Sequence, residues 1–198
     1  MGSTLRADRR RVRGHVLRDH LRHLERTGGV GVRGATHAVM GITLGAAAAA
    51  PLGLPGPHLA AWTATTTVFA LAPDLDTRRS IASRHAPVLS WAVRRTTGHR
   101  GWTHRASTVA VLLTIGTLMG VAIWTYTGEP AWWIGAASAT GAAIHILGDA
   151  LTRAGVPWRD GRITLTPLRA DSDALNVAAV VVSTLICAAA WRTHLPTT

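Results

Sequence analysis

Residues 98–127 have the sequence GHRGWTHRASTVAVLLTIGTLMGVAIWTYT, in which a short basic segment is followed directly by a long apolar one. The apolar part, 106–127, contains no charged residue. It is long enough to cross the hydrocarbon core of a bilayer, which takes about 20 residues as a helix. The basic segment contains His99 and His104, each followed by an arginine. This stretch therefore predicts a membrane-spanning helix with potential metal ligands just before its start.

Four further apolar stretches lie along the chain, and the five together predict an all-α, polytopic integral membrane protein. We expect a helical bundle with about five transmembrane or membrane-embedded helices. The segment 59–72 is short and rich in threonine, which alone would indicate a buried core helix, but the short connection PGPH before it makes it the return arm of a helical hairpin. The five predicted helices cover 38–54, 59–72, 106–127, 131–151 and 174–191.

The arginines are sorted between alternate connections of this predicted bundle. Nine lie in 1–37, seven in 77–105 and four in 152–173, whereas the other side of the membrane would hold only Arg192. Because basic residues are retained on the cytoplasmic side, this bias predicts that the N-terminus lies inside and the C-terminus outside. We expect the membrane to be the bacterial cytoplasmic (inner) membrane. Five tryptophans near the arginine-free ends are expected to act as interfacial anchors: Trp62, Trp124, Trp132, Trp133 and Trp191.

Seven ionisable residues fall at helix ends that this topology places on the cytoplasmic side. Within the fourth apolar stretch, His145 and Asp149 are four residues apart and share one face of a helix. Since the seven come from four separate segments, we expect them to meet in one site at the membrane surface. The seven residues are His37, Asp74, Asp76, His99, His104, His145 and Asp149.

A metal site accounts for these residues better than separate structural roles do. A lone histidine on a helix is usually structural, and an aspartate pair after a helix is usually a solvated cap. A free carboxylate such as Asp149 is costly inside an apolar segment, however, and a divalent cation offsets that cost. Imidazole nitrogen together with carboxylate oxygen suits Zn²⁺, and also Mn²⁺ or iron. Arg100, next to His99, could hold a phosphate oxygen or stabilise a transition state.

The chain divides into a basic arm, 1–33, and a membrane-embedded domain, 34–198. The arm sequence LRADRRRVRGHVLRDHLRHLERTGG, 5–29, is either disordered or an amphipathic helix lying on anionic lipid. No recognition motif supports binding to nucleic acid. The single cysteine, Cys187, excludes an intramolecular disulfide and a cysteine-based metal site.

Four motifs resemble those of the YdjM-type membrane-bound metal-dependent hydrolases over about 36–170. They are THAVMG (36–41), PDLD (73–76) followed by Ser80, HRGWTH (99–104) and HILGDALTRAG (145–155). That family is considered similar to zinc-dependent phospholipase C and P1 nuclease. The resemblance implies two or three zinc ions, with Mn²⁺ as an alternative, bound by His37, Asp74, His99, His104, His145 and Asp149, with Asp76 as an addition.

The chain also departs from the family pattern. A serine commonly follows the second histidine of the third motif, where this chain has Arg105. An acidic residue often follows the fourth motif at a distance, and Asp171 or Asp173 would supply it.

The expected function is therefore hydrolysis of a phosphoester in a lipid or lipid-linked substrate at the cytoplasmic interface. Asp74 or Asp76 would accept a proton, and Arg100 would stabilise the charge on phosphate. Hydrogen bonds to the ligands are expected from Thr36, Thr103 and Thr152.

Two other functions stay open at this stage. One is a non-catalytic membrane scaffold or regulatory protein whose arm binds anionic lipid, DNA or a protein. The other is an ion transporter, which needs polar residues at several depths. Apart from serine, threonine and glycine, the centres of the apolar segments contain no polar residue, so transport ranks last.

Overall fold

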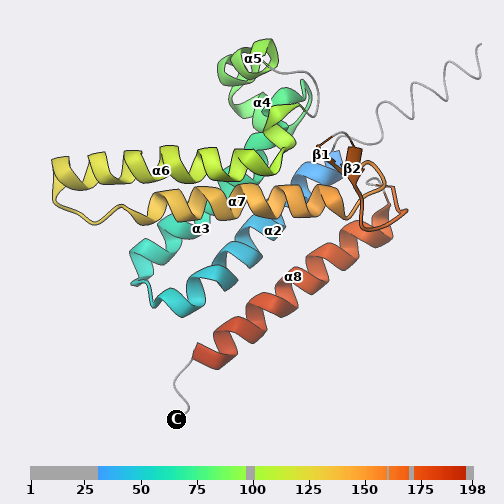
Figure 1. Ribbon diagram of the computed structural model, residues 1–198. Coiled ribbons are helices and arrows are strands. Elements are labelled where there is room, and N and C mark those ends of the chain that lie inside the picture. The colour runs from blue at the N-terminus through green and yellow to red at the C-terminus, as the bar shows by residue number, and fades with distance from the viewer. Residues whose placement is uncertain (1–30, 97–100, 160, 170–171, 195–198) are drawn as a thin grey trace, which may run out of the picture.

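Five long helices form a bundle, with a smaller helical segment projecting from one end (Figure 1). The computed structural model describes residues 31–96, 101–159, 161–169 and 172–194. The five expected apolar stretches each form a helix, which confirms that part of the prediction. The long helices are α2 (Gly31–Ala49), α3 (Gly56–Leu71), α6 (Ala106–Thr127), α7 (Trp133–Ala150) and α8 (Asp173–His194).

The helices follow one another as two hairpins and a final helix. The 3-10 turn η1 (Ala50–Leu52) lies between α2 and α3, which form the expected helical hairpin, and a short loop joins α6 to α7. Most of the PGPH sequence, Gly56 to His58, belongs to the start of α3 rather than to the connection. Between the hairpins lie η2 (Ala72–Asp76), α4 (Ile81–His85), α5 (Pro87–Thr96) and η3 (Trp102–His104). Consequently the start of α2, the end of α3, the start of α6 and the end of α7 meet at one end of the bundle.

Helix α7 is the centre of the bundle and packs against α2, α3 and α6. Its inner positions are small, and the side chains of Ala137 and Ala142 are fully buried. Small residues let helix backbones approach closely, and this gives close van der Waals contact between the helices. In a membrane such contact is a main source of packing energy, because the hydrophobic effect does not drive helices together there. At Gly141, a Cβ atom would collide with the backbone of α3 at Thr66.

The hairpin of α2 and α3 is also held by hydrogen bonds between the two helices. The indole Nε1 of Trp62 donates to the carbonyl of Gly45 at 2.8 Å, and Thr66 Oγ1 donates to the carbonyl of Gly41 at 3.2 Å. Trp62 is only 3% exposed, so its predicted role as an interfacial anchor is wrong. Trp124 and Trp132 are about half exposed, as an anchor requires.

Three helices of the described chain are long and apolar enough to cross a membrane: Gly34–Leu52, Ala106–Thr127 and Asp173–His194. The outward faces of α6 and α8 are aliphatic, with Leu118 65% exposed and Leu185 63% exposed. Such faces suit contact with lipid chains. The other two long helices differ from these three. Helix α3 is shorter, with 16 residues, and α7, with 18 residues, contains the polar side chains of His145 and Asp149.

A small β-hairpin is added to the otherwise helical fold. Strands β1 (Val156–Trp158) and β2 (Gly161–Ile163) pair antiparallel, with Val156 opposite Ile163. The segment that follows closes the end of α7, because the N–H of Leu165 donates to the carbonyl of Ala150 at 2.7 Å. The last carbonyls of a helix lack partners within it, so this segment fixes the end that contains Asp149.

Candidate metal centre

Six of the seven predicted site residues lie within the described chain, and the structure brings them together at one end of the bundle. His37 lies near the start of α2, Asp74 and Asp76 lie in η2, His104 lies in η3, and α7 supplies the remaining two. The six residues are His37, Asp74, Asp76, His104, His145 and Asp149. His99 and Arg100 are outside the described residues.

Three atoms of this cluster form a compact buried triangle. His104 Nε2 and His145 Nε2 lie 3.3 Å apart. One carboxylate oxygen of Asp149, Oδ2, lies 3.5 Å from the first of these nitrogens and 3.8 Å from the second. Two nitrogens bound to the same tetrahedral zinc, each at about 2.0–2.1 Å, lie about 3.3–3.4 Å apart. The triangle therefore has the dimensions of three ligands around one ion.

Hydrogen-bond partners assign the tautomers of the two histidines. His145 Nδ1 lies 2.8 Å from the carbonyl of Ala70, which can only accept, so that nitrogen carries the proton. His104 Nδ1 lies 3.4 Å from Asp76 Oδ2, and a carboxylate favours a proton there as well. Both Nε2 atoms then present lone pairs to each other. Two facing lone pairs repel, and a shared cation removes the repulsion.

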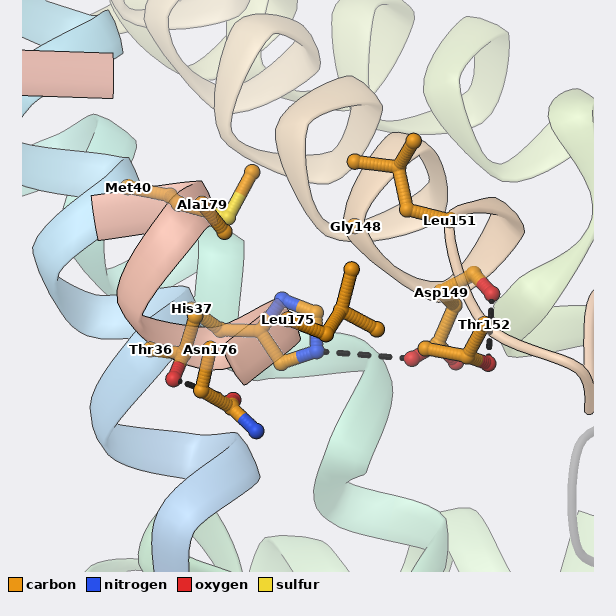
Figure 2. Close-up of a pocket in the computed structure, with 10 residues that line it drawn as sticks. All are labelled: Thr36, His37, Met40, Gly148, Asp149, Leu151, Thr152, Leu175, Asn176 and Ala179. Carbon is orange, nitrogen blue, oxygen red and sulfur yellow. Dashed lines mark hydrogen bonds and ion pairs between the residues drawn. The ribbon is translucent and has the colours of Figure 1, made fainter. Parts of the chain in front are cut away.

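The second oxygen of Asp149 extends the cluster toward α2. Oδ1 lies 3.4 Å from His37 Nε2, so the two oxygens of this carboxylate face different histidines. Figure 2 shows His37 and Asp149 joined across the small pocket between α2, α7 and α8. The ring of His37 stacks on that of His145, with centroids 4.1 Å apart. A carboxylate in this position can bridge two ions.

Asp74 completes a second potential ligand group with His104 and His145. Its Oδ1 lies 4.0 Å from His145 Nε2, and its side chain is 21% exposed. Burial raises the pKa of the Asp74 carboxyl above its usual value. Of the described carboxylates in the cluster, Asp74 is the most accessible to water.

Asp76 lies behind His104 rather than beside the facing nitrogens. Its carboxylate accepts hydrogen bonds from Thr103 Oγ1 at 3.1 Å and Thr77 Oγ1 at 3.0 Å, and it faces the Nδ1 side of the imidazole. Carboxylates in this position fix the orientation and tautomer of a ligating histidine. The geometry thus suits Asp76 for orienting His104.

Comparison with known protein families matches residues 32–195 to the YdjM inner membrane protein family. The chain belongs to this family. No curated protein and no solved structure matches the chain. The family description and the three long apolar helices together make this YdjM family member a membrane protein. All six described cluster residues lie within the matched range.

The three threonines expected near the ligands differ in what they contact in this YdjM protein. Thr103 bonds Asp76, and its Oγ1 lies 3.0 Å from His104 Nδ1, as expected of a residue that supports ligands. Thr152 donates to the backbone carbonyl of Asp149 at 2.8 Å. Thr36 instead donates to Asn176 on α8 at 2.6 Å. Figure 2 shows the last two contacts on either side of His37.

Two described residues mark the departures from the YdjM motif pattern: Arg105, which directly follows His104, and Asp173. Arg105 is exposed and precedes the first turn of α6. Asp173 is exposed in the first turn of α8, and Asp171 is outside the described residues. The described part of the chain therefore gives neither Arg105 nor Asp173 a direct contact with the cluster.

Two residues that position the site are not evident from ligand chemistry alone. Gly148 lies against the ring of His37, and a Cβ atom there would come within 2.8 Å of His37 Cε1. The glycine in the motif HILGD is the only sequence signal for this contact. Asn176 joins α8 to α2 through Thr36, one residue before His37, and nothing in its apolar sequence context marks it.

Proposed function

We propose that this protein is a membrane-bound, metal-dependent hydrolase that cleaves a phosphoester of a lipid or lipid-linked substrate at the cytoplasmic face of the inner membrane. The observation that supports this most strongly is the triangle of His104 Nε2, His145 Nε2 and Asp149 Oδ2, with edges of 3.3, 3.5 and 3.8 Å. Its three residues are at most 5% exposed. Nitrogen and oxygen donors that converge in this way would all bind one divalent ion.

The donor set suits Zn²⁺, with Mn²⁺ as the alternative, because it combines imidazole nitrogen with carboxylate oxygen. The proposed ligands are His37, Asp74, His104, His145 and Asp149, with His99 added by the family motif. Two or three bound ions would hold phosphate oxygens and acidify a water for attack at neutral pH.

The side chains around the ligands have separate roles in this proposal. Asp76 holds His104 with its Nε2 lone pair directed into the cluster. Asp74 is the carboxylate that water can reach, which suits a group that accepts a proton from the attacking water. Arg100 would neutralise charge on the phosphate.

The location of the arginines supports a cytoplasmic site that faces anionic headgroups. The arginine-rich segments α4, α5 and the β-hairpin lie at the same end of the bundle as the cluster (Figure 1). On α5, the guanidinium of Arg95 lies 4.3 Å over the ring of Trp91, and this tryptophan is 52% exposed. An exposed basic and aromatic surface of this kind is typical of a helix at the headgroup level. Helices α3 and α7 would then be embedded within the bundle.

Phosphate release from lipid substrates tests the proposal. We expect the purified protein, reconstituted with Zn²⁺ or Mn²⁺, to release inorganic phosphate from phosphatidate or from an isoprenyl phosphate in vesicles. Asp149→Asn should reduce the rate to background, whereas His85→Ala should not, because His85 is exposed and outside the cluster.

Deletion of residues 1–30 separates the enzyme from the scaffold alternative. A hydrolase with its site in the bundle keeps its rate without the basic arm. Absence of hydrolysis on every lipid phosphate, combined with loss of a binding partner on deletion of the arm, would favour the scaffold instead.

A further inference from the structure

A second, apolar cavity opens beside the metal cluster between α2, α7 and α8. Its volume is about 310 Å³, which is within the range of about 300–1,000 Å³ typical of ligand sites. It adjoins the small pocket that contains His37 and Asp149. The pocket and the cavity share four lining residues: Met40, Leu151, Leu175 and Ala179.

The cavity runs along the helices, away from the cluster. On α8 it is lined by Leu175, Ala179, Val182 and Ile186, whose spacing places them on one face of the helix. From Leu175 to Ile186 the helix advances by eleven residue steps and rises about 16 Å. This groove therefore leads from the polar end of the bundle into the part that lies among lipid chains.

The lining of the groove is suited to an apolar occupant. Apart from Ser183, its lining side chains are aliphatic or thioether, and Ser183 Oγ already donates to the carbonyl of Val180 at 3.0 Å. The groove is open to the outside, because Leu147 and Val182 on its rim are 48% and 53% exposed. An occupant can enter sideways from the bilayer.

At its polar end, the groove adjoins the small pocket lined by His37. His37 Nδ1 is buried and has no hydrogen-bond partner within the described chain. His37 lines this small pocket together with Asp149, so the pocket joins the apolar lining of the groove to the proposed metal ligands.

We propose that this groove binds one hydrocarbon chain of a phosphate-bearing membrane lipid, with the chain along α8 and the headgroup at the His37–Asp149 end. The proposal rests on the proposed function, since it makes the lipid chain part of what the hydrolase recognises. A free phosphate or a water-soluble phosphoester has no hydrocarbon chain that could fill the groove. The continuity between groove and pocket, and the direction of the groove along the helices, favour a lipid over a second protein chain.

Photo-crosslinking tests the groove independently of hydrolysis. A phosphatidate and an isoprenyl phosphate, each with a photoreactive group on the hydrocarbon chain, are added in vesicles to the full-length protein, and labelled peptides are found by mass spectrometry. We expect labelling at 179–186 of α8 and near Leu147. The variant Val182→Trp should reduce it about tenfold or more. Val181→Trp is the matched control, because Val181 is similarly exposed but does not line the groove.

Hydrolysis by the same two variants separates this proposal from the proposed function. Val182→Trp should slow cleavage of long-chain lipid phosphates but leave a water-soluble phosphoester unaffected, and Val181→Trp should affect neither. Labelling spread evenly over the outer faces of α6 and α8, or crosslinks between two protein copies through the groove, would overturn the groove as a lipid site. Specific labelling without any hydrolysis would instead retain the groove and reject the hydrolase.

Discussion

The Nε2 atoms of His104 and His145 lie 3.3 Å apart, although 41 residues separate the two histidines in the chain. The Nδ1 atom of each imidazole faces an acceptor: the carbonyl of Ala70 for His145 and the carboxylate of Asp76 for His104. Because both rings are fixed by acceptors on their Nδ1 side, their lone pairs converge. The convergence involves four helical segments, α3, η2, η3 and α7, and a shared metal ion accounts for it better than packing alone.

Gly148→Ala should weaken the metal site through His37. Alanine has the higher helix propensity, by about 1 kcal/mol, so the change would stabilise α7 if the site were unimportant. The added methyl group would instead meet the His37 ring at 2.8 Å and push it away from Asp149. We expect lower metal content at an unchanged helix content, measured by elemental analysis and circular dichroism. Full metal content in this variant would show that His37 is not a ligand.

Asp76→Asn should reduce metal affinity without removing a proposed direct ligand. The amide keeps the size of the side chain but loses the charge that favours a proton on His104 Nδ1. Loss of such supporting carboxylates typically lowers metal affinity about 10–100-fold. Titration with a competing chelator measures the change, and Asp173→Asn is the control because Asp173 is exposed on α8. Equal metal affinities for the two variants would show that Asp76 does not support the metal site.

Metal retention should fall as the solution becomes acidic. Histidine ligands bind metal as neutral imidazole, whose ordinary pKa is about 6.5, and protons compete with the ion below that value. We therefore expect metal to be retained at about pH 8, lost by about pH 5 and regained on return to neutral pH with added Zn²⁺. Dialysis at each pH followed by elemental analysis measures this. Metal content that is constant over this range would argue against histidine ligands.

Single cysteines should report opposite sides of the membrane at the two ends of the bundle. In a Cys187→Ser background, a cysteine replacing Glu129 lies in the loop between α6 and α7, and one replacing Arg153 lies at the cluster end. The proposed orientation predicts that a membrane-impermeant thiol reagent labels the first in intact cells and the second only after lysis. Labelling with the reverse pattern would place the cluster outside.

Much of this architecture is predictable because hydrophobic length and motif residues are local signals. The five apolar stretches predict the helices. The pairing of His145 with Asp149 follows from helical periodicity, since residues four apart share a face. The β-hairpin at 156–163 gives no such signal, because its strands are only three residues long.

Features that depend on tertiary contact could not be predicted in the same way. Trp62 lies in an apolar run whether it faces lipid or the neighbouring helix, and only its bond to Gly45 shows that it is buried. Likewise, the motif PDLD does not distinguish the two aspartates. Their different positions, Asp74 beside His145 and Asp76 behind His104, depend on how η2 folds against α7 and η3.

Metal content of the purified full-length protein is the most direct test of the central claim. Elemental analysis should find bound Zn²⁺ or Mn²⁺ in the unaltered protein and in His85→Ala, and little or none in His145→Ala and Asp149→Asn. Circular dichroism and thermal unfolding establish that each variant is folded. Equal metal content in all four folded proteins, or none in the unaltered protein after reloading with Zn²⁺ and Mn²⁺, would contradict the account.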